Sequence, residues 1–332
     1  MSPWPKRALA GLTGAASLAA FYALVVERAR VRVDAFTVVV DKAGLTSDGL
    51  TILHLSDFHF KAGGWIQERK IASLRRALGE QEYDLVAVTG DLIHEVAGLP
   101  AALAFLRSLR PRLGGFSVPG NHDYCEYSMW GMFGETGSKV AGALAGGLGD
   151  RLGQVRAFIR KVLHNEVVRL PVAYNDISAL HAALGAVGVR SLVNAAAHVQ
   201  ADGVDLWVAG LDDFTEGRPD LQAALAGVPA GAPLVLLSHN PDVWLDPLVS
   251  RADLVLAGHT HGGQVRLPLV GAAHTQGTHL TRRRPAGWFR RGGTRMFVTR
   301  GLGESIPLRF GAGPQAALIR IVAAPTEAAA RP

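Results

Sequence analysis

Apolar runs alternate with amphipathic stretches along the first half of the chain. Leu50–Leu55, Leu85–Val88 and Phe116–Val118 are short, largely apolar runs of the kind that form buried strands. Between them, Gln67–Leu78 and Ala101–Leu109 carry apolar residues at helical spacing. Strands that alternate with helices form sheets covered by helical layers, so the pattern predicts an α/β fold.

The same pattern returns in the second half, where a helix is predicted over Ile177–Leu184. The remaining predicted strands are Val31–Val33, Phe36–Val40, Ser191–Val193, Leu206–Ala209, Pro233–Leu237, Leu254–Leu256, Arg295–Arg300 and Ala317–Ile321. We therefore expect one domain over residues 31–322 and a disordered Ala/Pro-rich tail over residues 323–332.

The alternation stops between residues 126 and 176, which are predicted to form an inserted, cap-like segment. Residues 131–153 are rich in glycine, and Arg151–Leu170 has the pattern of a basic amphipathic helix. Two interpretations of this helix remain open. It packs its apolar side on the domain as an ordinary surface helix, or it serves as a cap or membrane-resting element near the active site.

The first thirty residues differ from the rest of the chain. Residues Ala8–Val26 carry no charge, and a helix needs about 20 apolar residues to span a bilayer. We expect residues 1–30 to form an N-terminal transmembrane helix that anchors the protein in the cell membrane as a single-pass anchor. A cleaved signal peptide and a buried helix of a soluble protein are the alternatives. Basic residues flank both ends, so the membrane orientation stays open.

Composition narrows the possible partners. The chain has 332 residues, 48% of them apolar, and a net charge of +6, which suits an anionic membrane surface or a phosphate-bearing substrate. Cys125 is the only cysteine, so no intrachain disulfide is possible. Aromatic residues make up 7% and are not interleaved with arginines, which argues against a nucleic-acid partner. No obligate protein partner is implied.

Arg282–Arg284 and Arg290–Arg291 form either a solvated loop or a contact for lipid headgroups or a distal phosphate.

Polar side chains follow the predicted strands at the points where they end. In the last cluster, His259 and His261 stand at positions i and i+2, so their side chains leave the end of one strand on the same face. The whole set is Asp57, His59, Asp91, Asn121, His122, His239, His259 and His261. Oxygen and nitrogen ligands without thiolates suit Mn, Fe, Zn or Co. The set is too large for one ion, so we expect two ions about 3.5 to 4 Å apart, with Asp91 as the bridging carboxylate.

These clusters resemble the five-block signature of the calcineurin-like metallophosphoesterase superfamily. The matching blocks are Asp57-Phe58-His59, Gly90-Asp91, Gly120-Asn121-His122-Asp123, Ser238-His239 and Gly258-His259-Thr260-His261. Within the superfamily, the chain is similar to a bacterial membrane-associated branch that includes UDP-2,3-diacylglucosamine pyrophosphohydrolases. The resemblance implies a four-layer α/β/β/α sandwich with a dinuclear metal centre.

The resemblance also implies a role for each residue. Asp57, His59, Asp91 and His261 would hold one ion, and Asp91, Asn121, His239 and His259 the other. His122 would protonate the leaving oxygen or stabilise the transferring phosphoryl group, and Asp123 would orient His122. Asp212 and Asp213 are either outer contacts of this site, substrate-binding groups or part of a solvated turn.

The expected activity is metal-dependent hydrolysis of phosphodiester or pyrophosphate bonds. A water or hydroxide held by two divalent metal ions, with Mn favoured, would attack phosphorus. A lipid-linked substrate fits the predicted anchor. The alternative is a catalytically silent metal-binding or scaffold protein on the same fold.

Overall fold

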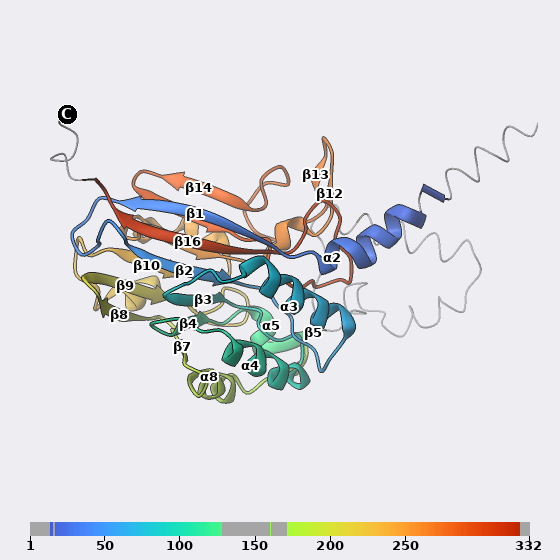
Figure 1. Ribbon diagram of the computed structural model, residues 1–332, viewed down its shortest axis with the longest axis horizontal. Helices are drawn as coiled ribbons and strands as arrows, with labels where there is room; N and C mark the ends of the chain where they lie inside the picture. Colours follow the sequence, from blue (N-terminus) through green and yellow to red (C-terminus); the bar gives the residue numbers. More distant parts are fainter. Residues whose placement is uncertain (1–13, 16, 128–159, 161–170, 326–332) are drawn as a thin grey trace, which may run out of the picture.

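Two six-stranded sheets lie face to face through the middle of the molecule (Figure 1). The computed structural model describes residues 14–15, 17–127, 160 and 171–325. Apolar side chains from both sheets form one shared core, for example Val38 and Ile52 from the first sheet and Leu206 and Leu256 from the second. Figure 1 shows helices below the first sheet, so the predicted α/β class is confirmed.

The first sheet is largely parallel. Its strands, in spatial order, are β1 (Arg32–Val40), β16 (Gln315–Ala323), β2 (Leu50–Leu55), β3 (Leu85–Thr89), β4 (Gly115–Val118) and β7 (Val189–Ser191). Strands β2, β3, β4 and β7 run parallel, and only β16 pairs with β2 in the antiparallel sense. Every residue of β3 is buried, as expected of a parallel strand that is covered on both faces.

The second sheet repeats this plan. Its strands, in spatial order, are β14 (Gly287–Arg291), β15 (Thr294–Val298), β11 (Leu254–Ala257), β10 (Leu234–Leu237), β9 (Val204–Gly210) and β8 (Ala195–Ala201). The four inner strands are parallel, and the two edge strands β14 and β8 are antiparallel to their neighbours. The parallel strands of a sheet end at one edge, so the loops that follow them gather there.

Helices cover the outer face of each sheet. The first sheet carries α3 (Trp65–Leu78), α4 (Leu99–Ser108) and α8 (Ile177–Gly185), whose apolar sides form one core with β2 and β3. The second carries α9 (Leu221–Leu225) and the 3-10 helices η4 (Pro241–Leu245) and η5 (Pro247–Arg251). The shorter elements are η2 (Val96–Gly98), α5 (Asn121–Tyr124), η6 (His261–Gly263), β5 (Cys125–Tyr127), β6 (Pro171–Tyr174), β12 (Arg266–Leu267) and β13 (Gly271–Ala272).

The predicted elements and the observed ones differ at the edges of the sheets. The two strands expected over residues 31–40 are one strand, β1, and the strand expected at Ser191–Val193 lies two residues earlier as β7. Strands β8 and β14 were not predicted. An edge strand is half exposed and pairs on one side only, so its sequence lacks the apolar run that marks an inner strand.

Two predicted segments fall largely or wholly outside the described residues. The amphipathic helix at Arg151–Leu170 is one, and the C-terminal tail beyond residue 325 is the other. The flanks of the inserted segment are described, and they pair with each other as the antiparallel strands β5 and β6. The insertion therefore leaves and rejoins the domain at one place, directly after α5.

The N-terminal segment is helical up to Ala29 and passes through a π-helical stretch, η1 (Tyr22–Val26), into α2 (Glu27–Ala29). No helix in the described part of the chain is both long and apolar enough to cross a membrane. Residues 1–13 and 16, which include part of the expected anchor, lie outside that part. The transmembrane helix accordingly stays a prediction.

Buried charges hold this helix on the domain. Glu27 accepts a hydrogen bond from the Gly311 N–H (3.0 Å), and the Ala23 carbonyl accepts one from the Arg309 N–H (3.0 Å). The Arg28 guanidinium donates to Glu304 (3.0 Å). The orientation of the helix relative to the domain is therefore set by three separate bonds to one loop, residues 304–311.

Glu304 is the common partner of three cations. Its carboxylate lies 3.0 Å from Arg28 Nε, 2.5 Å from Lys70 Nζ and 3.9 Å from Arg309 Nε, and its side chain is 5% exposed. Burial alone would raise the pKa of Glu304, but Lys70 and Arg309 hold it below its ordinary value. Burial also lowers the pKa of Lys70 to about 8.

Glu304→Gln is expected to lower the free energy of unfolding near pH 7 by about 3 to 5 kcal/mol, since it leaves buried cations uncompensated. The unfolded chain binds a proton at Glu304 more readily than the folded chain does, so the carboxylate stabilises the fold above about pH 4.5 and progressively less below it. Urea unfolding of both proteins between pH 7 and pH 3 should show the gap closing as the pH falls. The exposed Glu80→Gln is the control, and a gap that is independent of pH would contradict the assignment.

Candidate metal centre

Loops from both sheets bring six of the predicted ligands together. The ligand atoms of Asp57, His59, Asp91 and His261 lie within 4.8 Å of one another, and so do those of Asp91, His239 and His259. Asp57 and His59 follow β2, and Asp91 follows β3, in the first sheet. The three histidines follow β10 and β11 in the second sheet, so the centre lies where the ends of the two sheets meet.

Asp91 belongs to both groups. Its Oδ2 atom lies 3.5 Å from His59 Nε2 and 3.4 Å from His239 Nε2. Other ligand-type atoms approach as closely: the Nε2 atoms of His59 and His261 are 3.1 Å apart, and Nδ1 of His259 is 2.9 Å from Nε2 of His239. Nitrogen and carboxylate atoms that converge in this way fit divalent cations, and a carboxylate that faces both groups fits the bridging position.

The backbone at the centre is strained. Asp57, His59, Asp91, His259 and His261 all adopt positive φ values between 50° and 67°. Each such residue costs on the order of 1 to 3 kcal/mol and persists only where the surrounding structure enforces it. Five of the ten non-glycine residues with positive φ in the described chain are predicted metal ligands, so the strain is concentrated at this site.

Two glycines allow the loops to pack this closely. A Cβ atom on Gly258 would lie 2.0 Å from Ser56 Oγ and 2.3 Å from the Asp57 carboxylate. A Cβ atom on Gly120 would lie 2.4 Å from Asp91 Oδ1. Any larger residue at these positions would displace a predicted ligand.

Hydrogen bonds and burial orient the ligands and set their charge. His239 is held by a bond between its Nδ1 and the Thr89 carbonyl (2.8 Å), which leaves Nε2 facing the centre. The Asp57 carboxylate accepts the N–H of His259. Burial opposes ionisation of Asp91, yet His239 and the neighbouring histidines hold its pKa well below the ordinary value. Burial lowers the pKa of His59, which favours the neutral form that binds metals.

Asn121, His122 and Asp123 form the first turn of α5 and are all buried. The His122 N–H donates to Asp91 Oδ1 (2.8 Å), which ties this turn to the Asp91 carboxylate. Asp123 accepts the N–H groups of Gly120, Leu92 and Ile93. Its carboxylate therefore connects the segments that carry Asp91 and Asn121. The expectation that Asp123 orients His122 stays a prediction. Burial raises the pKa of Asp123 to about 7.

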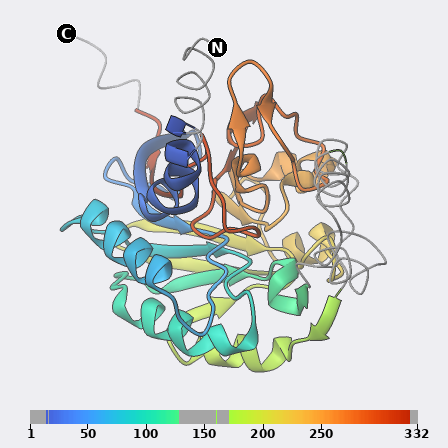
Figure 2. The same cartoon turned by 90° about the vertical axis from the view of Figure 1, so that its right-hand side faces the viewer.

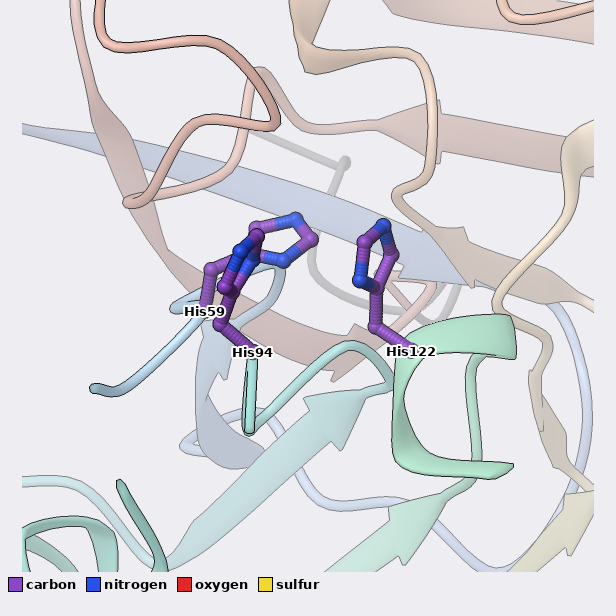
Figure 3. Close-up of side chains that lie close together, drawn as sticks. All are labelled: His59, His94 and His122. Carbon is purple, nitrogen blue, oxygen red and sulfur yellow. The ribbon is translucent and has the colours of Figure 1, made fainter. Parts of the chain in front are cut away.

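A third histidine, which sequence reasoning did not select, lies beside His122. Figure 3 shows the rings of His59, His94 and His122 gathered together, with His122 extending from helix α5, and one nitrogen atom of each ring lies within 4.8 Å of the others. The His94 and His122 rings are stacked, 5.3 Å apart, and the His59 and His122 rings meet edge to face at 4.5 Å. The available signal was its position, three residues after Asp91 in the same loop.

Asp212 and Asp213 do not form a solvated turn. Both are buried, and Asp213 accepts the N–H groups of Thr215 and Glu216. Asp212 accepts the Tyr124 hydroxyl, so this loop packs against the end of α5. Burial raises the pKa of Asp213. Both carboxylates are therefore held within this loop, and their contact with the metal site or the substrate stays a prediction.

The Calcineurin-like phosphoesterase family model matches residues 50–263, which contain every strand-end loop described above. The chain belongs to the calcineurin-like phosphoesterase family. As a member of this family, it is a hydrolase of phosphoric esters, and the metal-ligand clusters agree with the divalent metals that metallophosphoesterases use.

Relatives of this phosphoesterase come from bacteria and vertebrates. The uncharacterized metallophosphoesterase YkuE of Bacillus subtilis (strain 168) is 30% identical over 280 residues, which cover 81% of this chain and 77% of that protein. A UDP-2,3-diacylglucosamine pyrophosphatase, LpxG of Chlamydia muridarum, is 27% identical over 83% of this chain and 85% of its own length. A protein of Danio rerio named transmembrane protein with metallophosphoesterase domain is 27% identical over 74% of this chain and 48% of its own length.

Proposed function

We propose that this phosphoesterase hydrolyses phosphodiester or pyrophosphate bonds at a dinuclear metal centre. The observation that carries the proposal is the position of Asp91 in both ligand groups, 3.5 Å from His59 and 3.4 Å from His239. Asp57, His59, Asp91 and His261 would hold one ion. Asp91, Asn121, His239 and His259 would hold the other. Carboxylate, amide and imidazole ligands suit Mn, Fe, Zn or Co, of which Mn is favoured here.

Bound divalent cations would supply Lewis-acid activation of water and neutralise phosphoryl charge. The chain's own residues orient the reaction. His122 would donate a proton to the leaving oxygen or a hydrogen bond to the phosphoryl group, and the stacked His94 would hold the His122 ring in place. The bond from the His122 backbone N–H to Asp91 ties the backbone that carries this ring to the proposed bridging ligand.

A cavity beside the centre supports a lipid-linked substrate. It has a volume of about 270 Å³ and extends from His59 to Arg28, on the helix that enters from the N-terminus. Phe58, Ile66 and Ile71 form an apolar part of its wall that would take a hydrocarbon chain, and the rest of the wall includes the charged residues Arg28, Lys61, Lys70 and Glu304. The LpxG relatives are named for a diacylated pyrophosphate substrate, which agrees with such a cavity.

We also propose that the protein is attached to a membrane through residues 1–30. The uncharged stretch Ala8–Val26 supports this, as do the relatives named transmembrane proteins. Leu18, Phe21 and Leu24 on the described part of the helix are exposed, as expected of a helix that enters lipid.

Metal removal and restoration test the enzymatic proposal. After chelation, the detergent-solubilised full chain should lose hydrolysis of bis(p-nitrophenyl) phosphate, and Mn²⁺ should restore it with about two ions per chain by elemental analysis. Two bound ions without hydrolysis of any diester or pyrophosphate would instead support the scaffold alternative. Equal rates on soluble and amphiphilic diesters would remove the lipid-linked substrate but leave the phosphoesterase activity in place.

A further inference from the structure

We propose that the hairpin formed by β12 and β13, with the turn Leu267–Gly271, inserts into the surface of an anionic lipid bilayer. It would act as a second membrane contact beside the N-terminal helix. The inference rests on the membrane attachment proposed above, and it adds a surface that the metal centre does not use.

The tip of the hairpin presents apolar side chains to solvent. Leu269 is 99% exposed, Val270 is 54% exposed and Leu267 is 48% exposed. A single exposed leucine is ordinary on a protein surface, but three apolar residues within four positions of one turn form a patch. Burying these side chains in hydrocarbon removes their apolar surface from water and would favour insertion of the tip.

The backbone of the turn is built to hold Leu269 outward. Leu269 has a φ of 68°, and the Val270 N–H donates to the Pro268 carbonyl (2.8 Å) across it. This three-residue turn is the strained kind, in which a leucine costs more than a glycine would. Burial of the side chain in lipid would help to offset that cost.

The hairpin is fixed to the domain and does not fold back over its own apolar tip. The Arg266 N–H donates to the Phe310 carbonyl (2.7 Å), and the Ala272 N–H donates to the Arg282 carbonyl (2.7 Å). Gly271 packs directly against that same carbonyl, where a Cβ atom would lie 2.5 Å from the oxygen. The tip therefore projects from a braced base.

The charges around the hairpin match an anionic surface. Between Asp253 and Glu304 the chain carries eight arginines and no carboxylate side chain. Three of these arginines lie at the base of the hairpin: Arg266, Arg282 and Arg283. The backbone bonds described above place Arg266 and Arg282 there, and the Arg266 guanidinium donates a hydrogen bond to the Arg283 carbonyl (3.3 Å). Each arginine near an anionic leaflet adds electrostatic attraction, so an apolar tip above a basic base fits a bilayer with acidic headgroups.

The hairpin also lies beside the helix that is expected to enter the membrane. Figures 1 and 2 both show the β12–β13 hairpin projecting next to α2, on the same side of the molecule. Tyr22 of the helix and Leu267, Leu269 and Phe310 line one hollow of about 640 Å³ between them. Because buried hydrogen bonds fix the helix on loop 304–311, hairpin and helix would meet a bilayer together.

A probe at the tip tests this inference on the full chain. Cys125 is fully buried, so Leu269→Cys provides a single accessible thiol for the fluorophore NBD. In vesicles of phosphatidylcholine with one third phosphatidylglycerol, we expect emission to rise on the order of two-fold and to be quenched by lipids with nitroxide-labelled chains. Arg282→Gln with Arg283→Gln should reduce the quenching, as should vesicles of phosphatidylcholine alone.

The matched control is Asp48→Cys, where the native side chain is 97% exposed. This residue belongs to the turn between β1 and β2, and that turn lies at the end of the sheet away from the β12–β13 hairpin (Figure 1). Its probe should stay unquenched. Co-flotation with vesicles without quenching at position 269 would overturn the hairpin contact alone, whereas failure to co-float would overturn the attachment as well. An emission change that follows protein concentration without lipid quenching would indicate a second copy of the chain and also overturn the inference. Hydrolysis of a soluble diester, measured separately, reports on the metal centre.

Discussion

Asp91→Asn is expected to lower the rate of diester hydrolysis by on the order of 10³-fold or more, which corresponds to about 4 kcal/mol of barrier. Asp91 belongs to both of the ligand groups that are assigned to the two proposed ions, and its Oδ2 atom faces His59 and His239 at nearly equal distances. The amide keeps the shape of the side chain but removes its charge and replaces one acceptor with a donor. Two cations held close together depend on that charge to offset their repulsion.

Elemental analysis distinguishes this explanation from misfolding. The variant should retain less than one equivalent of tightly bound metal, while its circular dichroism matches that of the wild type. Asp48→Asn makes the same chemical change at an exposed turn and should retain both metal and activity. An Asp91→Asn protein with two bound ions and full turnover would show that Asp91 does not bridge.

His122→Gln is expected to lower the turnover of a diester with an alkoxide leaving group by about 10²- to 10⁴-fold, with both metals retained. His122 lies beside the ligand His59 but is not a member of either metal group that contains Asp91, so its loss should remove a donor and leave the metal ligands intact. Steady-state rates combined with metal content provide the measurement.

The leaving group distinguishes the two roles considered for His122. A p-nitrophenolate leaves without protonation, so a proton donor predicts a much smaller loss on that substrate than on the alkoxide. Equal losses would assign His122 to phosphoryl stabilisation, and loss of metal would remove it from both roles. His198→Gln on the exposed edge strand β8 is the matched control and should leave both rates unchanged.

Most of the predicted ligands could be found from the sequence, because they follow strands with clear apolar patterns. Leu50–Leu55, Leu85–Thr89 and Leu254–Ala257 are apolar runs that form buried parallel strands, and chemistry placed after such strands must collect at one edge of a sheet. His94 was not predicted as a site residue, because the direction of a histidine three residues beyond a strand end is not set until its loop is folded. The edge strands β8 and β14 were not predicted because half-exposed strands carry no distinctive apolar pattern.

The sequence by itself determined which atoms could bind metal, since the identity and order of Asp57, His59, Asp91, His239, His259 and His261 set the ligand chemistry before any fold was known. Only the tertiary structure decided that loops of two separate sheets share one carboxylate, because nothing local relates β2 and β3 to β10 and β11. It also decided that the ligands lie on strained backbone, that Glu304 holds the N-terminal helix in place and that Leu269 projects into solvent. Each of these depends on contacts between residues far apart in the chain, which a pattern of neighbouring residues cannot encode.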